Sequence, residues 1–133
     1  MTRLLYILLP LAAGAFLAAQ APINARLRVT LDSPLAGALV SFLVGTVALL
    51  AAAAATGGVR GLGAIGGGPW WAYLGGILGA VFVVVGILAT PRVGVTVTFV
   101  AVIAGQVAAA AVIDHNGWLG VTHSPITWER AAA

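Results

Sequence analysis

The side chains best suited to chemistry in this sequence are three neutral amides within apolar stretches. Gln20 and Asn24 are four residues apart and so share one face of a helix, and Gln106 lies inside a later apolar stretch. An amide has about four hydrogen-bonding sites. Leaving them unpaired in hydrocarbon costs several kcal/mol. We therefore expect the amides to line a polar cavity. The alternative is that they hold helices together, through hydrogen bonds worth about 1 kcal/mol each.

One ionisable pair, Asp114 and His115, follows the last apolar stretch. Its place at a helix end favours an interfacial pair, and a proton relay is the alternative, because ionisable groups near lipid are candidates for function. No residue between Arg3 and Arg26 carries a carboxylate, so proton exchange on a carboxylate in the first span has no support. Cysteine is absent, and neither metal-binding nor nucleophilic motifs occur. We expect no catalytic residue, metal or cofactor, and the protein is not predicted to be an enzyme.

The elements that position these residues follow from composition. Hydrophobic residues make up 62% of the 133 residues and charged residues 7%, whereas soluble domains average about 45–50% and 25%. The charges separate four uncharged runs, each long enough to cross a bilayer as a helix. We predict an all-α integral membrane protein with a four-transmembrane-helix bundle, forming a single transmembrane domain over residues 1–133. The predicted spans are about 4–25, 34–56, 69–90 and 93–114, with a short C-terminal tail over 115–133.

Local signals set the boundaries of these spans. Asp32 or Ser33 is the expected N-cap of the second span, with Pro34 in its first turn. Pro91 is expected to stop the third span, and Gly117 to cap the fourth. The first span also resembles a secretory signal with a small-residue cleavage site, but proline after that site and three further spans favour its retention.

Glycines predict both a connector and helix contacts. Seven glycines fall within residues 57–68, which favours a flexible connector over a helix. Small residues at four-residue spacing let helices approach closely in lipid. The glycines expected to pack helices are Gly37 and Gly45 on the second span and Gly75 and Gly79 on the third.

The arginines do not favour one orientation. With alternating spans, each side of the membrane receives three, namely Arg3, Arg60 and Arg130 against Arg26, Arg28 and Arg92. This tie favours dual topology, in which copies insert both ways and pair as an antiparallel homodimer or with a homologue. Gln20 of one copy and Gln106 of the other then reach similar depth. Arginines spread in this way make no basic stripe, so no nucleic-acid partner is expected.

Several stretches together resemble one family, the YdcZ-type small inner-membrane proteins of the drug/metabolite transporter superfamily. They are "QAPINARLR", "SPLAGALVSFLVGT", "GGILGAVFV" and "PRVGVTVTFVAVIAGQVAAAAVIDHNGWLG". The resemblance implies a multi-pass protein of the bacterial inner (plasma) membrane with half of a drug/metabolite-transporter-like fold, exporting or transporting a metabolite and forming antiparallel assemblies. Members usually add a fifth apolar helix, whereas this sequence continues with "VTHSPITWERAAA".

These observations predict a secondary transporter of a small polar or cationic metabolite that works as an antiparallel dual-topology dimer. A fluoride-channel-like small channel and a noncatalytic membrane assembly subunit are the alternatives. The expected substrate-binding residues are Gln20, Asn24, Ser41, Phe42 and Gln106.

Overall fold

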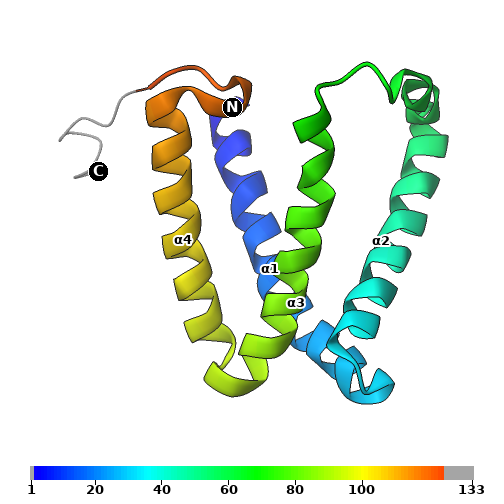
Figure 1. Cartoon of the computed structure of the whole chain (residues 1–133), viewed down its shortest axis with the longest axis vertical. Helices are drawn as coiled ribbons and strands as arrows, with labels where there is room; N and C mark the ends of the chain where they lie inside the picture. Colours follow the sequence, from blue (N-terminus) through cyan, green and yellow to red (C-terminus); the bar gives the residue numbers. More distant parts are fainter. Residues whose placement is uncertain (1, 125–133) are drawn as a thin grey trace. The chain divides into compact units, whose positions relative to one another are not determined.

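The computed structural model describes residues 2–124, with side-chain surroundings from residue 4 onward, and this part of the chain is helical without strands. Four α-helices are long and apolar enough to cross a membrane (Figure 1). They are α1 (Thr2–Leu31), α2 (Pro34–Thr56), α3 (Gly75–Val93) and α4 (Val95–Asn116). The described residues also form short 3-10 helices, namely η1 (Gly58–Ala64), η2 (Trp70–Leu74) and η3 (Trp118–Gly120). The predicted all-α membrane fold class is confirmed.

The chain divides into two compact units, which are described separately. The first unit extends to Val95 and contains α1, α2 and α3 with η1 and η2. The second begins at Thr96 and contains nearly all of α4 together with η3. The prediction that residues 1–133 form a single domain stays a prediction.

Helix α1 continues to Leu31 rather than ending near Ala25 as expected. It ends in a Schellman-type turn, in which the Ser33 N–H donates to the Arg28 carbonyl at 3.2 Å and Asp32 has a φ of 49°. The residue before a proline is restricted to extended backbone, and Ser33 before Pro34 has φ −155° and ψ 123°. The helix therefore stops where the local backbone turns.

Helix α2 begins as expected, with Ser33 rather than Asp32 as its N-cap. The Ser33 hydroxyl oxygen accepts a hydrogen bond from the Ala36 N–H at 3.2 Å, and Pro34 lies in the first turn. At the other end, Gly57 adopts a left-handed conformation with a φ of 77°. This conformation suits glycine and ends the helix.

Helix α3 passes through Pro91 and ends at Val93, so the expected stop at this proline is wrong. A proline within a helix removes one N–H donor and crowds the carbonyl four residues earlier, but membrane helices tolerate it where other groups satisfy the freed backbone. The Arg92 side chain donates to the Leu88 carbonyl at 2.9 Å, and Gly94, with a φ of 85°, donates its N–H to the Thr90 carbonyl at 3.0 Å. These two hydrogen bonds complete the last turn.

The glycine-rich connector is more ordered than expected. Its first part forms η1, and its second part is held by Tyr73. The Tyr73 hydroxyl donates to the Ile65 carbonyl and accepts from the Gly68 N–H at 3.3 Å. The Tyr73 hydroxyl therefore ties the connector to η2, which leads into α3.

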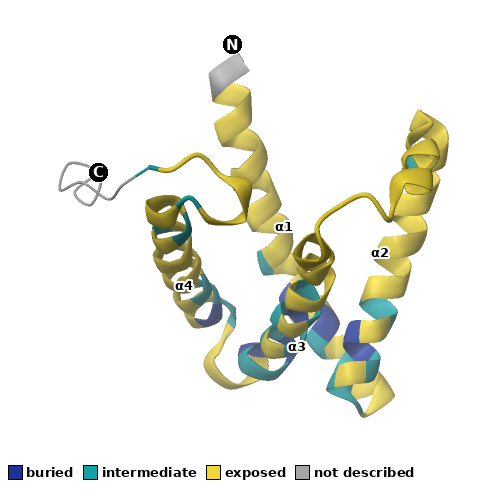
Figure 2. Cartoon of the chain, turned by 45° about the horizontal axis from the view of Figure 1, so that its top comes forward, coloured by how far each residue is buried: buried dark blue, intermediate teal, exposed yellow. Residues whose placement is uncertain are grey.

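The buried residues of the first unit gather where its three helices meet, near the turn between α1 and α2 (Figure 2). Ala38, Val83 and Ile87 form the core, with Phe82 and Val84 packed against it. Most other large apolar side chains of the unit are exposed. Such an apolar outer surface is what lipid requires of spanning helices.

Candidate functional site: a pocket between three helices

A pocket of about 320 Å³ lies within the first unit, between α1, α2 and α3. Its lining residues come from all three helices and are mostly apolar. They are Leu17 and Gln20 from α1, Ser41, Phe42, Gly45, Thr46 and Leu49 from α2, and Gly79, Phe82 and Val83 from α3. An apolar pocket of this size with a few polar groups is typical of a small-molecule site.

Three lining side chains are polar, and two of them have no hydrogen-bond partner within the described part of the chain. The Thr46 hydroxyl donates to the Phe42 carbonyl at 2.8 Å, which satisfies its donor within α2. The Gln20 amide and the Ser41 hydroxyl make no such bond to the described residues. The pocket therefore offers one free amide and one free hydroxyl for pairing.

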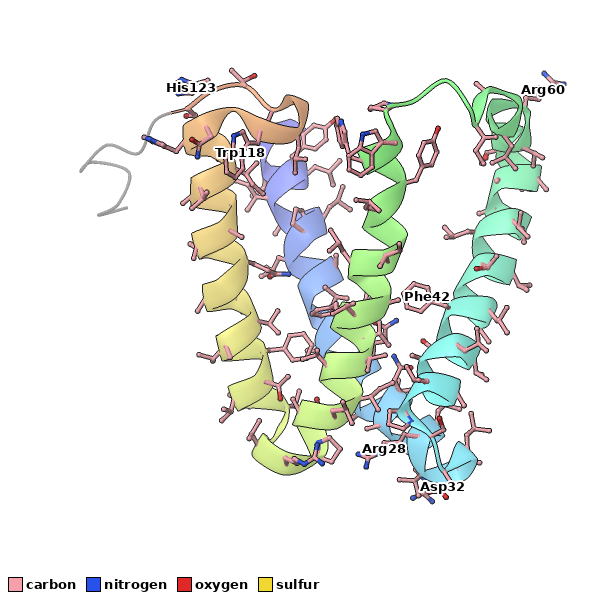
Figure 3. All side chains as sticks on the ribbon, viewed as in Figure 1. Arg28, Asp32, Phe42, Arg60, Trp118 and His123 are labelled. Atoms are coloured by element: carbon pink, nitrogen blue, oxygen red, sulfur yellow. The ribbon has the colours of Figure 1, made fainter. Side chains whose placement is uncertain are left out.

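Phe42 forms much of the wall between α2 and α3. Its side chain extends from α2 towards α3 (Figure 3). A Cβ placed on Gly79 would lie 3.6 Å from the tip of the Phe42 ring. A methyl group at this position would be in ordinary van der Waals contact with the ring, so Phe42 packs closely against the surface of α3.

Below the pocket, α1 and α2 come into close contact. A Cβ on Gly37 would lie 3.1 Å from the backbone nitrogen of Arg28 and 3.5 Å from the backbone carbonyl oxygen of Asn24. Asn24 is only 3% exposed and does not line the pocket. The two amides that share a face of α1 therefore differ in surroundings, with Gln20 at the pocket and Asn24 at the helix contact.

The charges of the first unit lie at its ends rather than at the pocket. Arg28 and Asp32 lie near the α1–α2 turn, whereas Arg60 lies at the far end of α2 (Figure 3). None of the ten lining residues carries an ionisable group. Any ligand in the pocket thus meets neutral dipoles and aromatic rings, without a charged partner from the lining.

The second unit contains the remaining predicted site residues, Gln106, Asp114 and His115. Gln106 is an exposed residue of α4. At the end of this helix, the Asp114 carbonyl accepts from the Ser124 N–H at 2.8 Å, and the rings of His115 and His123 lie 6.4 Å apart. Gly117, with a φ of 64°, follows the helix as expected. The interfacial and proton-relay roles of Asp114 and His115 both stay predictions.

Of the five expected substrate-binding residues, the pocket brings together Gln20, Ser41 and Phe42. The predicted packing glycines also separate. Gly37 touches the α1 backbone and Gly79 contacts Phe42, while the Cβ positions of Gly45 and Gly75 have nothing within 4 Å. Apart from Gly45 and Gly79, which were predicted for helix packing, sequence reasoning missed five lining residues, although those on α2 continue the three- and four-residue spacing of Ser41 and Phe42. The missed residues are Leu17, Thr46, Leu49, Phe82 and Val83.

The described residues contain no group of three or more His, Cys, Asp or Glu side chains that could hold a metal ion.

Comparison with known protein families matches residues 5–133 to the family described as "Putative inner membrane exporter, YdcZ". Comparisons with curated proteins and with solved structures give no significant match. The family match covers nearly the whole chain and agrees with the four apolar helices. The chain therefore belongs to the YdcZ family of inner-membrane exporters.

Proposed function

We propose that this protein exports a small polar metabolite and that the pocket between α1, α2 and α3 is its substrate site. The observation that carries this proposal is that the Gln20 amide and the Ser41 hydroxyl, both without a hydrogen-bond partner among the described residues, line the same otherwise apolar pocket. Polar groups at membrane depth require a partner, because hydrocarbon provides none. A substrate, or water in its absence, supplies that partner.

Different lining residues provide hydrogen bonds and apolar contacts to the substrate. The Gln20 amide both donates and accepts hydrogen bonds, and the Ser41 hydroxyl does the same. Phe42 provides an apolar face beside them. Asn24, buried beneath the pocket at the α1–α2 contact, positions α1 so that Gln20 faces the substrate.

The proposal includes an antiparallel dual-topology dimer. The equal division of arginines between the two sides supports it, since neither orientation has an excess of positive charge. Gln106 is exposed on α4 and needs a polar partner in the membrane. In the proposed dimer, Gln106 of one copy extends the transport path at the depth of Gln20 of the other.

Cysteine accessibility tests the site, because the chain has no native cysteine. Gln20→Cys and Ser41→Cys are reconstituted in lipid nanodiscs and treated with a small, uncharged, water-borne thiol reagent. Leu43→Cys is the matched control, because Leu43 lies two residues from Ser41 on α2, is exposed and does not line the pocket. We expect both pocket cysteines to react and the Leu43→Cys control to stay unlabelled in lipid. Pocket cysteines as unreactive as this control would refute the proposed site.

Export itself is tested with Gln20→Leu, which keeps the side chain's bulk but removes its hydrogen bonds. Cells producing the wild-type protein are expected to release metabolites that untargeted mass spectrometry detects in the medium, and cells producing Gln20→Leu are not. Crosslinking measures assembly in the same cells. Lost release with normal assembly supports a transport path. Lost assembly instead favours a subunit whose amides only hold helices together, and release of fluoride alone favours a small channel.

A further inference from the structure

The pocket lacks charged side chains, and this lack restricts the ligands that it accepts. The ten lining residues include no Asp, Glu, Lys, Arg or His. The same holds for the central part of each span, since no such residue lies between Arg3 and Arg26, between Asp32 and Arg60, or between Arg92 and Asp114. Residues 61–91 contain none either. The pocket residues thus lie on stretches of α1, α2 and α3 that carry no charge.

A charged ligand in such a pocket loses its hydration without gaining a counter-ion, and this loss opposes binding strongly at low dielectric. Aromatic rings can partly replace a counter-ion for cations, but phenylalanine is a weaker partner than tryptophan. The pocket contains Phe42 and Phe82, whereas Trp70 and Trp71 lie outside its lining. The lining therefore favours a neutral ligand over a cation or an anion.

The polar groups define the rest of the ligand. Gln20 and Ser41 each offer a donor and an acceptor, which suits a primary amide or a hydroxyl group. The remaining lining is apolar and includes two aromatic rings, which suits a flat apolar body. We propose that the substrate is an uncharged amphiphile, with one amide or hydroxyl group attached to a small apolar or aromatic body. This inference rests on the proposed export function.

Three probes with the same indole body test this charge selection. Indole-3-acetamide is neutral, indole-3-acetate is its anionic counterpart, and tryptamine carries a cationic amine. Full-length Ser41→Cys in nanodiscs is labelled with the thiol reagent at increasing concentrations of each probe. A bound probe at twice its dissociation constant slows labelling about threefold. We expect indole-3-acetamide to protect at concentrations about tenfold lower than either charged probe, because only it enters without an unpaired charge.

A gain-of-function variant checks the physical cause. Gln20→Glu places a carboxylate in the pocket, and in the Ser41→Cys background it is expected to make tryptamine the most protective probe. Should this double variant fail to fold, as judged by gel filtration, Gln20→Cys replaces Ser41→Cys as a second reporter of the native charge selection.

The outcomes separate this inference from the export proposal. An unreactive Ser41→Cys, matching the Leu43→Cys control, would overturn the pocket as a substrate site. A reactive Ser41→Cys that either charged probe protects as well as indole-3-acetamide would overturn the neutral class and leave export intact. Protection by none of the three probes would overturn the amphiphilic class in the same way. Stronger protection by indole-3-acetamide, reversed by Gln20→Glu, supports the inference.

Discussion

Replacing Gly37 by alanine should weaken the contact between α1 and α2. The new Cβ would lie 3.1 Å from the Arg28 nitrogen, 3.4 Å from the Arg28 Cα and 3.5 Å from the Asn24 carbonyl oxygen. All three are backbone atoms of α1, so no side-chain rotation relieves the contact. The two helices must separate by a few tenths of an ångström, and the packing around Asn24 must follow.

The expected loss of stability follows from two opposing terms. Overpacking a tight contact costs about 1–3 kcal/mol. Alanine is a better helix former than glycine by about 1 kcal/mol. We therefore expect Gly37→Ala to reduce the free energy of unfolding by about 1 kcal/mol.

Gly45 is the matched control, because it lies on the same helix and a Cβ there has nothing within 4 Å. Gly45→Ala gains the higher helix propensity of alanine without creating a close contact, so we expect it to raise the free energy of unfolding by about 1 kcal/mol. The two variants should then differ by about 2 kcal/mol in unfolding by sodium dodecyl sulfate in mixed micelles, followed by circular dichroism. Equal unfolding midpoints for both variants would show that the close contact at Gly37 does not exist in the folded protein.

Three further perturbations test local features. Ser33→Ala removes the hydrogen bond to the Ala36 N–H and should cost about 1 kcal/mol in the same unfolding assay, while Ser33→Asp keeps a capping oxygen and most of the stability; equal losses in both would refute the cap. Tyr73→Phe removes the bonds that hold the connector, so hydrogen exchange should speed up over residues 58–68 and stay unchanged in α2, and an unaltered connector would contradict this role. Two lysines inserted beside Arg60 should drive insertion into one orientation, as read by a C-terminal reporter; a reporter already confined to one side in the unmodified chain would rule out dual topology.

The sequence alone was sufficient to predict the membrane class, the helical fold and the start of α2. Composition determines whether a chain enters lipid, since apolar side chains and few charges are favoured there. The start of α2 is likewise determined by residues next to it in the sequence. Ser33 supplies the capping oxygen and Pro34 restricts the backbone before it, whatever packs around them. Family membership, too, was recognisable from short motifs of the chain, and the match over residues 5–133 confirmed it.

Helix ends near prolines and arginines were less predictable. Propensity predicts a helix stop at Pro91, yet α3 reaches Val93 because the Arg92 side chain and the Gly94 N–H satisfy carbonyls of its last turn. Helix α1 likewise continues through Pro22 to Leu31. A proline removes one donor, and whether the helix survives depends on the hydrogen bonds made on either side of it.

The tertiary structure alone decided which residues share a site. Periodicity placed Gln20 and Asn24 on one face of α1, but it could not say at what depth a neighbouring helix meets that face. The helices touch at Gly37, so Asn24 is buried there, while Gln20 lies four residues earlier in α1, beside the pocket. The same four-residue spacing therefore yields a packing contact at Gly37 and a pocket wall at Gly45. Spacing along a helix specifies direction around its axis, whereas contact depends on where the axes approach.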